Sequence, residues 1–287
     1  KPVGRHGSVL RASAVKEYAL EHGLPVLQPV KMKDPEFVEQ LREYNADLQV
    51  VVAFRMLPEV IWDMPRFGTF NVHAALLPQY RGAAPINWAV INGETKTGVT
   101  TFFLDHDIDT GRIIMQREFP IPDDADVEYV YDGLMELGAG ICQDTVDLVI
   151  STDGNVPSQP QREDIELKAA PKIFKETCQI DWNNNAKRIY DFVRGLSPYP
   201  GTWTTLASNS ETEKTEASII KIFKTCKTGI NCNGTAPGTM KTENTKLMVA
   251  ANDEWLDIVE LQAAGKKRMA ARDFLNGFKH ITDMHMK

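Results

Sequence analysis

Residues 70–86 constrain the fold of this 287-residue chain more than any other stretch. Strand-forming residues over 69–72 close an apolar run, and Pro78, Gly82 and Pro85 then force a turn-rich loop before an apolar helical stretch resumes. A strand that leads through a loop into a helix is the building unit of an open α/β sheet, and ligands bind at the carboxyl ends of strands in such sheets. The segment therefore predicts both the architecture of its domain and the position of a binding site.

Asn71 and His73 occupy alternate positions of the predicted strand, so their side chains project from the same face. An asparagine amide can donate a hydrogen bond, and a histidine can take up or release a proton near neutral pH. Either residue alone is more often a satisfied turn residue than a catalyst. Together, beside a loop rich in proline and glycine, they predict a catalytic site.

The rest of the first 150 residues alternates between predicted helices and strands, which indicates a doubly wound α/β domain. Residues 48–54 form a near-continuous apolar run, as expected of a parallel strand buried on both faces. The other predicted elements are helices over 15–22, 34–44, 85–92 and 126–149, and strands over 25–28, 98–104 and 113–119. The chain has no Gly-x-Gly-x-x-Gly motif, so a dinucleotide is not predicted.

Residues 151–171 have the composition of a linker, with three prolines and mixed charge. The elements predicted after it are helices over 186–194 and 270–275, and short strands over 218–223, 246–250 and 255–261. Short strands separated by turn residues are typical of a small antiparallel barrel. A chain of 287 residues is long enough for two such domains.

The net charge of −7 argues at first against a nucleic-acid partner, because phosphate binding needs lysine and arginine. The charge is unevenly distributed, however. Residues 1–200 hold 20 Lys and Arg against 29 Asp and Glu, whereas residues 201–287 hold 12 against 10. The second part can therefore carry a basic face, although a solvated surface would explain the same lysines. The longest apolar run is strand-sized, well short of the ~18 residues of a membrane span.

The four cysteines show neither Cys-x-x-Cys spacing nor a neighbouring histidine cluster, so a zinc site is not predicted. They are too few for a disulfide scaffold in a chain of this length and are typical of free thiols in a reducing cytoplasm. They are Cys142, Cys178, Cys226 and Cys232. The loop over 105–111 holds three carboxylates and a histidine, which on composition alone could bind a metal.

Four segments resemble the folate-dependent formyltransferases. They are Asn71-x-His73 with residues 76–86 (Leu-Leu-Pro-Gln-Tyr-Arg-Gly-Ala-Ala-Pro-Ile), Asp109-Thr110-Gly111, residues 172–201, and Gly-Lys-Lys-Arg-Met at 265–269. The resemblance covers nearly the whole chain. The last segment, together with Arg-Gly-Leu-Ser-Pro-Tyr-Pro-Gly at 194–201, is similar to the family members that act on methionyl-tRNA.

The resemblance implies a fold and a division into domains. We expect a Rossmann-like formyltransferase domain with a parallel-rich sheet over residues 1–154, a linker over 155–173, and an OB-like barrel that binds tRNA over 174–287. Family members begin with a β-α-β unit ahead of a loop comparable to residues 1–7, so this opening unit is expected to be missing here.

The resemblance also implies a reaction, the transfer of a formyl group from the co-substrate 10-formyltetrahydrofolate to the α-amine of initiator methionyl-tRNA, without a metal. Its catalytic residues would be Asn71, His73 and Asp109. Asn71 would donate to the carbonyl oxygen as it becomes anionic, while His73 and Asp109 carry the proton. We expect the three to converge at the carboxyl edge of the sheet, and which of His73 and Asp109 is the immediate base stays open.

Further positions follow from the same resemblance. The folate pocket would involve Leu57, Pro58, Ala75, Leu76, Leu77 and Pro78. Ala75 stands where the family usually has serine, so one hydroxyl contact is absent. The residues expected to contact tRNA are Arg5, Lys266, Lys267 and Arg268. Asp105 and Asp107 fall where the family varies, and we expect them to be solvated, as we do His106.

Two alternatives remain. A related formyltransferase acting on an amino sugar nucleotide or another small amine shares the same Asn, His and Asp, and Asn87-Trp88 is similar to the sugar enzymes. Glycinamide ribonucleotide formyltransferase and the hydrolase domain of formyltetrahydrofolate dehydrogenase share them too. An inactive nucleic-acid-binding module is an alternative of a different class. For the favoured function, in translation initiation, we expect a cytoplasmic monomer.

Overall fold

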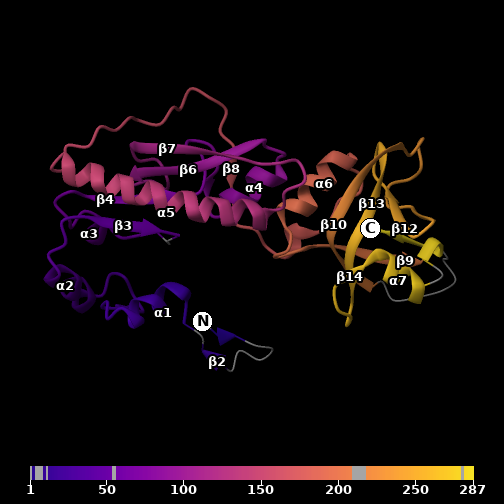
Figure 1. The fold of residues 1–287 in the computed structure, drawn as a ribbon, viewed down its shortest axis with the longest axis horizontal. Coiled ribbons are helices and arrows are strands. Elements are labelled where there is room, and N and C mark those ends of the chain that lie inside the picture. The colour runs from indigo at the N-terminus through magenta and orange to yellow at the C-terminus, as the bar shows by residue number, and fades with distance from the viewer. Residues whose placement is uncertain (1, 4–8, 11, 54–55, 209–217, 279–280) are drawn as a thin grey trace.

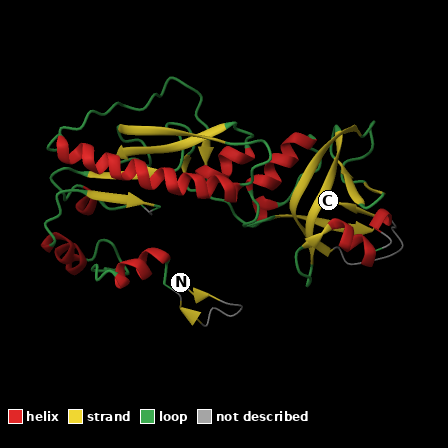
Figure 2. Ribbon diagram, in the orientation of Figure 1, coloured by secondary structure: helices red, strands yellow, loops and turns green. Residues whose placement is uncertain are grey.

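The computed structural model describes residues 2–3, 9–10, 12–53, 56–208, 218–278 and 281–287. They form two bodies with separate cores, a sheet covered by helices and an antiparallel barrel (Figure 1, Figure 2). The barrel follows the sheet along the chain, and the helix α6 (Ala186–Gly195) lies where the two bodies meet.

The first sheet is mixed. Its strand order is β3 (Gln49–Val52), β4 (Thr69–His73), β6 (Lys96–Phe103) and β7 (Ile113–Pro120). β3 and β4 are parallel, whereas β4, β6 and β7 are successively antiparallel. Helices α4 (Pro85–Ile91) and α5 (Val127–Ser151) complete this body, with α5 packed on β6 and β7. The predicted α/β class is confirmed.

Helix α5 forms where its periodicity predicts it. The Asp126 side chain caps its first turn by accepting a hydrogen bond from the Tyr129 backbone N–H at 3.0 Å. Val130, Leu134 and Ile141 recur at helical spacing and are buried against the sheet.

Two predictions about the early elements are wrong. β3 is not buried on both faces, because Val50 is 42% and Val52 64% exposed. The strand lies at the edge of the described sheet, and helix α1 (Ala14–Glu21), which buries none of its residues, is separate from the sheet in Figure 1. Residues 25–28 are irregular rather than a strand, since they take part in no strand pairing with the other described residues.

The second sheet is antiparallel and nearly closed. Its order is β11 (Met240–Glu243), β12 (Lys246–Ala250), β13 (Glu254–Ala263), β10 (Ser218–Asn231), β9 (Thr202–Ser208) and β15 (Met284–Met286), with β14 (Met269–Ala270) paired to β13. A bridge between Thr239 and His285 brings the two edges of the sheet together. The predicted barrel is confirmed, and β9, β11 and β15 are strands that the sequence pattern missed.

The barrel core explains why this body is stable. Apolar residues from alternate strand positions, such as Ile220, Ile222, Leu247 and Leu256, are almost completely buried together. The amphipathic helix α6 and helix α7 (Ala271–Gly277) cover this core with Ile189 and other apolar residues.

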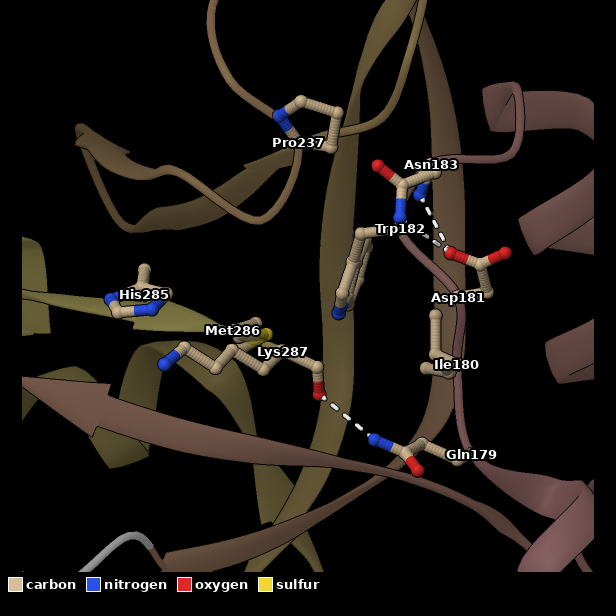
Figure 3. A pocket seen from close by; sticks show the side chains of 9 residues that line it. All are labelled: Gln179, Ile180, Asp181, Trp182, Asn183, Pro237, His285, Met286 and Lys287. Atoms are coloured by element: carbon tan, nitrogen blue, oxygen red, sulfur yellow. Dashed lines mark hydrogen bonds between the residues drawn. The ribbon is translucent and has the colours of Figure 1, made fainter.

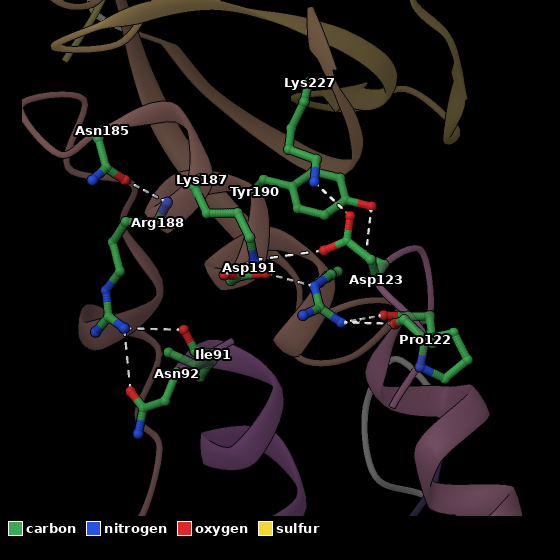
Figure 4. Close-up of polar contacts among 12 residues, drawn as sticks. Ile91, Asn92, Pro122, Asp123, Asn185, Lys187, Arg188, Tyr190, Asp191 and Lys227 are labelled. Carbon is green, nitrogen blue, oxygen red and sulfur yellow. Dashed lines mark hydrogen bonds and ion pairs between the residues drawn. The ribbon is translucent and has the colours of Figure 1, made fainter. Parts of the chain in front are cut away.

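The two bodies are joined by a polar contact around α6 (Figure 4). Asp191 and Arg194 are both buried and pair at 2.8 Å, and Arg194 also donates to the carbonyl oxygen of Ala125 at 2.9 Å. Lys227 of β10 reaches the Asp123 carboxylate at 2.5 Å. The hydrogen bond from Lys227 is the main reason that the pKa of Asp123 lies below its usual value.

The Arg-Gly-Leu motif at the end of α6 lies in this same contact between the two bodies. A Cβ added to Gly195 would lie 2.6 Å from the Ile91 Cγ1 atom, so only glycine lets α6 approach α4 so closely. The Asn87 amide donates to the Gly195 carbonyl oxygen at 2.8 Å. Asn87, whose sequence context resembles the sugar enzymes, therefore contacts the second body.

The segment predicted as a linker crosses back over the first body. β8 (Ala169–Ala170) pairs in parallel with β5 (Arg81–Gly82), and Gln159 exchanges two backbone hydrogen bonds with Ile113 at 2.8 and 2.9 Å. The remaining elements are β1 (Pro2–Val3), β2 (Val9–Leu10), α2 (Pro35–Glu43), α3 (Glu59–Trp62), η1 (Glu176–Cys178) and η2 (Ile281–Asp283). Within the described ranges, no helix combines the length and apolar character needed to cross a bilayer.

Candidate functional site

His73 and Asp109 form the centre of the candidate site. The Nδ1 atom of His73 lies 3.9 Å from the Oδ2 atom of Asp109, and both side chains are largely buried. The Nε2 atom of His73 lies 2.9 Å from the carbonyl oxygen of Tyr80. Because a carbonyl oxygen only accepts, Nε2 must carry the hydrogen, and Nδ1 is the nitrogen that can take up a proton facing the carboxylate.

Asn71 lies two residues before His73 on the same strand and therefore on the same face. Its Oδ1 atom is buried and has no hydrogen-bond partner among the described residues. Buried side-chain oxygens are nearly always hydrogen-bonded, so an orphaned one in the middle of β4 points to a water or a bound group as its partner.

The loop that carries Asp109 is held in an unusual conformation. Asp109 has φ of 59°, in the left-handed region that aspartate adopts more readily than most side chains. Its Oδ2 atom accepts a hydrogen bond from the Gly82 backbone N–H at 3.0 Å. A Cβ on Gly111 would lie 1.7 Å from the Phe103 carbonyl oxygen, so the Asp-Thr-Gly turn packs directly on β6.

The expectation that Asp109 meets His73 at a shared carboxyl edge of the sheet is wrong. β6 runs antiparallel to β4, so its carboxyl end lies beside the start of β4, with Phe103 opposite Phe70. The loop therefore turns back toward His73 instead of meeting it at a shared carboxyl edge. The sequence predicted a parallel arrangement because strand runs do not reveal strand direction.

The loop between β4 and α4 is fixed by a buried threonine. The hydroxyl of Thr100 donates to the Ala75 carbonyl oxygen at 2.6 Å and accepts from the Leu77 backbone N–H at 3.1 Å. Gln116 donates to the Leu77 carbonyl oxygen at 2.9 Å. These contacts hold the loop that presents Tyr80 and Gly82 to His73 and Asp109.

The residues predicted to contact folate fall into two groups. Ala75 is fully buried and Leu77 is 3% exposed, so their side chains fill the core beneath the loop. The half-buried members are Leu57, Pro58, Leu76 and Pro78. Folate contact by these six residues stays a prediction.

A pocket of about 490 Å³ lies in the barrel rather than at this site (Figure 3). Its walls include Trp182, Pro237 and His285, and none of its lining residues is Asn71 or a neighbour of it. A second pocket, of about 300 Å³, lies between Leu27 and helix α2. Neither contains a residue predicted to be catalytic.

The remaining predicted residues are placed as follows. Arg5 lies outside the described residues, while Lys266 and Lys267 are exposed on the turn between β13 and β14. Arg268 hydrogen-bonds to Glu260 at 2.7 Å, so part of its charge is already paired. Asp105, His106 and Asp107 are exposed, and no cluster of metal-ligating side chains occurs in the part of the chain that the structure describes.

Two polar groups near the site were missed by sequence reasoning. Gln161, from the segment after α5, hydrogen-bonds to the backbone of the Asp109 loop. The Tyr80 hydroxyl donates to Glu94 at 2.5 Å, and Lys168 donates to the same carboxylate oxygen at 2.5 Å. Burial, followed by the hydrogen bond to Glu94, raises the pKa of Tyr80 far above its ordinary value. Neither contact has a local sequence signal, because each joins residues that are distant along the chain.

Comparison with known families assigns both bodies. A family model described as Formyl transferase matches residues 1–146, and one described as Formyl transferase, C-terminal domain, matches residues 172–279.

Curated relatives match nearly the whole chain. It is 58% identical to the methionyl-tRNA formyltransferase of Parabacteroides distasonis, over 99% of this chain and 87% of that protein. It is 54% identical to the methionyl-tRNA formyltransferase of Bacteroides fragilis, over 99% of this chain and 86% of that protein.

Solved structures share the fold at low sequence identity. The sugar 3N-formyl transferase WlaRD has a TM-score of 0.62 and 18% identity, over 88% of this chain and 82% of that chain. HypX from Aquifex aeolicus, solved with tetrahydrofolic acid, has a TM-score of 0.57 and 20% identity, over 85% of this chain and 41% of that chain.

Proposed function

The chain belongs to the formyl transferase family, and we propose that it transfers the formyl group of 10-formyltetrahydrofolate to the α-amine of initiator methionyl-tRNA, for translation initiation. The observation that carries this proposal is the identity of 58% and 54% to methionyl-tRNA formyltransferases over 99% of the chain. The family predicted from the four sequence segments is confirmed. The sugar-directed alternative has less support, since WlaRD is only 18% identical.

Asn71 is proposed to bind the reacting groups. The folate co-substrate supplies the formyl carbonyl, whose oxygen gains negative charge as the amine attacks. The Asn71 Nδ2 group can donate to that oxygen, and a donor aimed at developing charge is typically worth about 3 kcal/mol. Its orphaned Oδ1 atom can accept from an N–H of the incoming amine. The donor and acceptor present in the site thus fit both reactants.

His73 and Asp109 are proposed to move the proton. The attacking amine must lose a proton, and Nδ1 of His73 is the available acceptor because Nε2 is engaged with the Tyr80 carbonyl oxygen. The Asp109 carboxylate at 3.9 Å stabilises the imidazolium that results. The imidazolium then gives this proton to the folate nitrogen as the bond between that nitrogen and the formyl carbon breaks, so that tetrahydrofolate leaves. The geometry therefore favours His73 as the immediate base and Asp109 as its charge partner.

The tRNA is proposed to lie along the barrel. Residues 1–200 carry an excess of nine acidic side chains, whereas residues 201–287 carry an excess of two basic ones, so phosphate contacts fall mainly to the second body. Lys266 and Lys267 are exposed on one turn and are the strongest candidates. Arg268 contributes less, since it is paired with Glu260.

The remaining expectations are also proposals. We divide the chain into a catalytic part over residues 1–154, a connecting segment over 155–173 and a tRNA-binding part over 174–287. Leu57, Pro58 and residues 75–78 are proposed to border the folate site. We propose a monomer in the cytoplasm, where charged initiator tRNA is used.

A formyl-transfer assay with competing acceptors tests this function. The 287-residue chain is incubated with 10-formyltetrahydrofolate labelled in the formyl group, and with initiator methionyl-tRNA, an amino sugar nucleotide or glycinamide ribonucleotide. We expect label in methionyl-tRNA with by far the highest kcat/KM. A higher kcat/KM for a small amine would replace the proposed acceptor with that amine.

A further inference from the structure

The loop that carries Asp109 needs external support to reach His73. Phe103, at the end of β6, lies opposite Phe70, whereas His73 lies opposite Thr100. Three strand positions span roughly 10 Å. The loop must turn back over that distance to bring the Asp109 carboxylate to 3.9 Å from His73 Nδ1.

The side-chain amide of Gln161 supplies this support. Its Nε2 group donates to the carbonyl oxygens of Asp109 at 2.8 Å and Gly111 at 2.9 Å. Its Oε1 atom accepts from the Nε and Nη2 atoms of Arg81 at 3.0 and 2.7 Å. The amide N–H groups of Gln161 therefore bind backbone carbonyl oxygens on either side of Thr110. Its amide oxygen binds Arg81, in the loop after β4.

These contacts close a ring around the carboxylate. Arg81 precedes Gly82, whose backbone N–H donates to Asp109 Oδ2 at 3.0 Å. Gln161 thus joins Arg81 to the backbone of Asp109, while Gly82 binds the side chain of the same residue. Hydrogen bonds to the backbone and to the side chain of Asp109 together stabilise its left-handed φ of 59°.

We propose that Gln161 is a positioning residue that orients the Asp109 carboxylate toward His73, an inference that rests on the proposed formyl transfer. Gln161 is 52 residues from Asp109 along the chain and acts through it rather than on the substrate. The segment that connects the two bodies therefore takes part in assembling the catalytic site.

Three variants separate this role from a general effect on folding. Gln161→Ala removes all four hydrogen bonds. Gln161→Glu keeps an oxygen for Arg81 but turns a second oxygen, in place of the donor, toward the carbonyls of Asp109 and Gly111. Gln159→Ala is the matched control, because the exposed Gln159 joins the same loop region through its backbone alone.

We expect both Gln161 variants to lower kcat for methionyl-tRNA by about 10²-fold, as small misplacements of catalytic groups do, with little change in either KM. Gln159→Ala should keep the wild-type kcat. In an Asp109→Asn background, Gln161→Ala should lower kcat little further, because the group it positions is already lost. Wild-type kcat in both Gln161 variants, or effects that multiply in the double variant, would overturn the inference.

Hydrogen exchange at Gly82 decides the question independently of activity. The Gly82 N–H is protected by its bond to Asp109 Oδ2, so Gln161→Ala should accelerate its exchange at least tenfold, and Gln159→Ala should not. Unchanged Gly82 protection in Gln161→Ala would overturn the positioning role. A wild-type chain that does not formylate methionyl-tRNA would refute the proposed function instead, and the exchange result would still decide the role of Gln161.

Discussion

Gly111 illustrates how backbone shape, and not side-chain chemistry alone, sets the position of Asp109. A Cβ at this position would lie 1.7 Å from the Phe103 carbonyl oxygen, a contact that cannot be relieved by rotating a side chain. At Gly138, inside α5, the nearest atom to an added Cβ is Val72 Cγ1 at 3.8 Å, which is ordinary packing. The two glycines therefore make a matched pair.

We expect Gly111→Ala to lower the free energy of unfolding by about 1–3 kcal/mol, because the loop must shift away from β6. Gly138→Ala should be neutral or stabilising by up to about 1 kcal/mol, since alanine is the better helix former. Urea unfolding measures both. Equal midpoints for Gly111→Ala and the wild type would contradict the packing described for the loop.

Asn71 gives a prediction in which activity and stability separate. Its Oδ1 atom has no partner among the described residues, so Asn71→Ala removes few hydrogen bonds within the protein. We expect a thermal midpoint near that of the wild type and a kcat lower by about 10²–10³, the usual effect of losing one donor to developing charge. A variant that keeps most of its kcat would exclude Asn71 from the reaction.

At the scale of helices and strands, local patterns predicted most elements. Helical periodicity located α5, and β12 has the predicted limits, Lys246–Ala250. Pattern could not show that β6 is antiparallel to β4, because direction depends on the path of the connecting chain. It also could not show that β3 is an exposed edge, since edge and central strands can share an apolar sequence.

The proposed catalytic residues came from the sequence in two ways. The spacing of Asn71 and His73 selected the first two, and the resemblance to the formyltransferases added Asp109 of the Asp-Thr-Gly turn. Gln161 was missed because its contact with Asp109 spans 52 residues and involves backbone carbonyls, which any residue carries. The segment at 155–173 has the composition of a linker, yet Gln161 hydrogen-bonds to Arg81 and to the backbone of the Asp109 loop, and β8 pairs with β5.

Glu94, a partly buried acidic residue, binds Lys168 of this segment and gives a pH-dependent prediction. Burial would raise the pKa of Glu94, but hydrogen bonds from Lys168 and Tyr80 outweigh it and hold the pKa below its usual value. The charged carboxylate therefore stabilises the fold above about pH 4.3, and this contribution is lost as the pH falls through the folded-state pKa.

We expect Lys168→Met to lower stability at neutral pH by no more than about 1 kcal/mol, because Lys168 is half exposed. The deficit should shrink as the pH falls below about 4. Lys175→Met, at an exposed lysine in the same region, is the control and should have no such pH dependence. Chemical unfolding at several pH values measures this. A deficit that stays constant down to acidic pH would argue against the Glu94 contact.

At the scale of the whole molecule, the two bodies divide charge and chemistry between them. The proposed catalytic residues lie in the acidic first body, and the exposed Lys266 and Lys267 lie on the barrel. Arg194 of α6, which pairs with Asp191 within the helix, joins the bodies through its hydrogen bond to the Ala125 carbonyl oxygen. Under the proposed function, a tRNA bound to the barrel would be kept in a fixed relation to the loops that carry His73 and Asp109.

The salt dependence of tRNA binding tests this division. Each phosphate contact contributes a slope of roughly −0.9 to log K against log salt on a duplex. We expect Lys266→Ala/Lys267→Ala to reduce the slope by one to two such contacts. Lys31→Ala/Lys33→Ala removes the same charge from exposed positions in the first body and should leave the slope unchanged. Identical slopes for both double variants would assign Lys266 and Lys267 to solvation only.

The most direct test of the whole account is steady-state formylation of initiator methionyl-tRNA by the wild type, Asp109→Asn and Asp107→Asn. Asp107 is an exposed carboxylate two residues away in the same loop, so it controls for loss of charge. The account predicts formylation by the wild type and by Asp107→Asn, and a kcat about 10²–10⁴ lower for Asp109→Asn with both KM values nearly unchanged. A wild type that leaves methionyl-tRNA unmodified, or an Asp109→Asn variant with wild-type kcat, would contradict it.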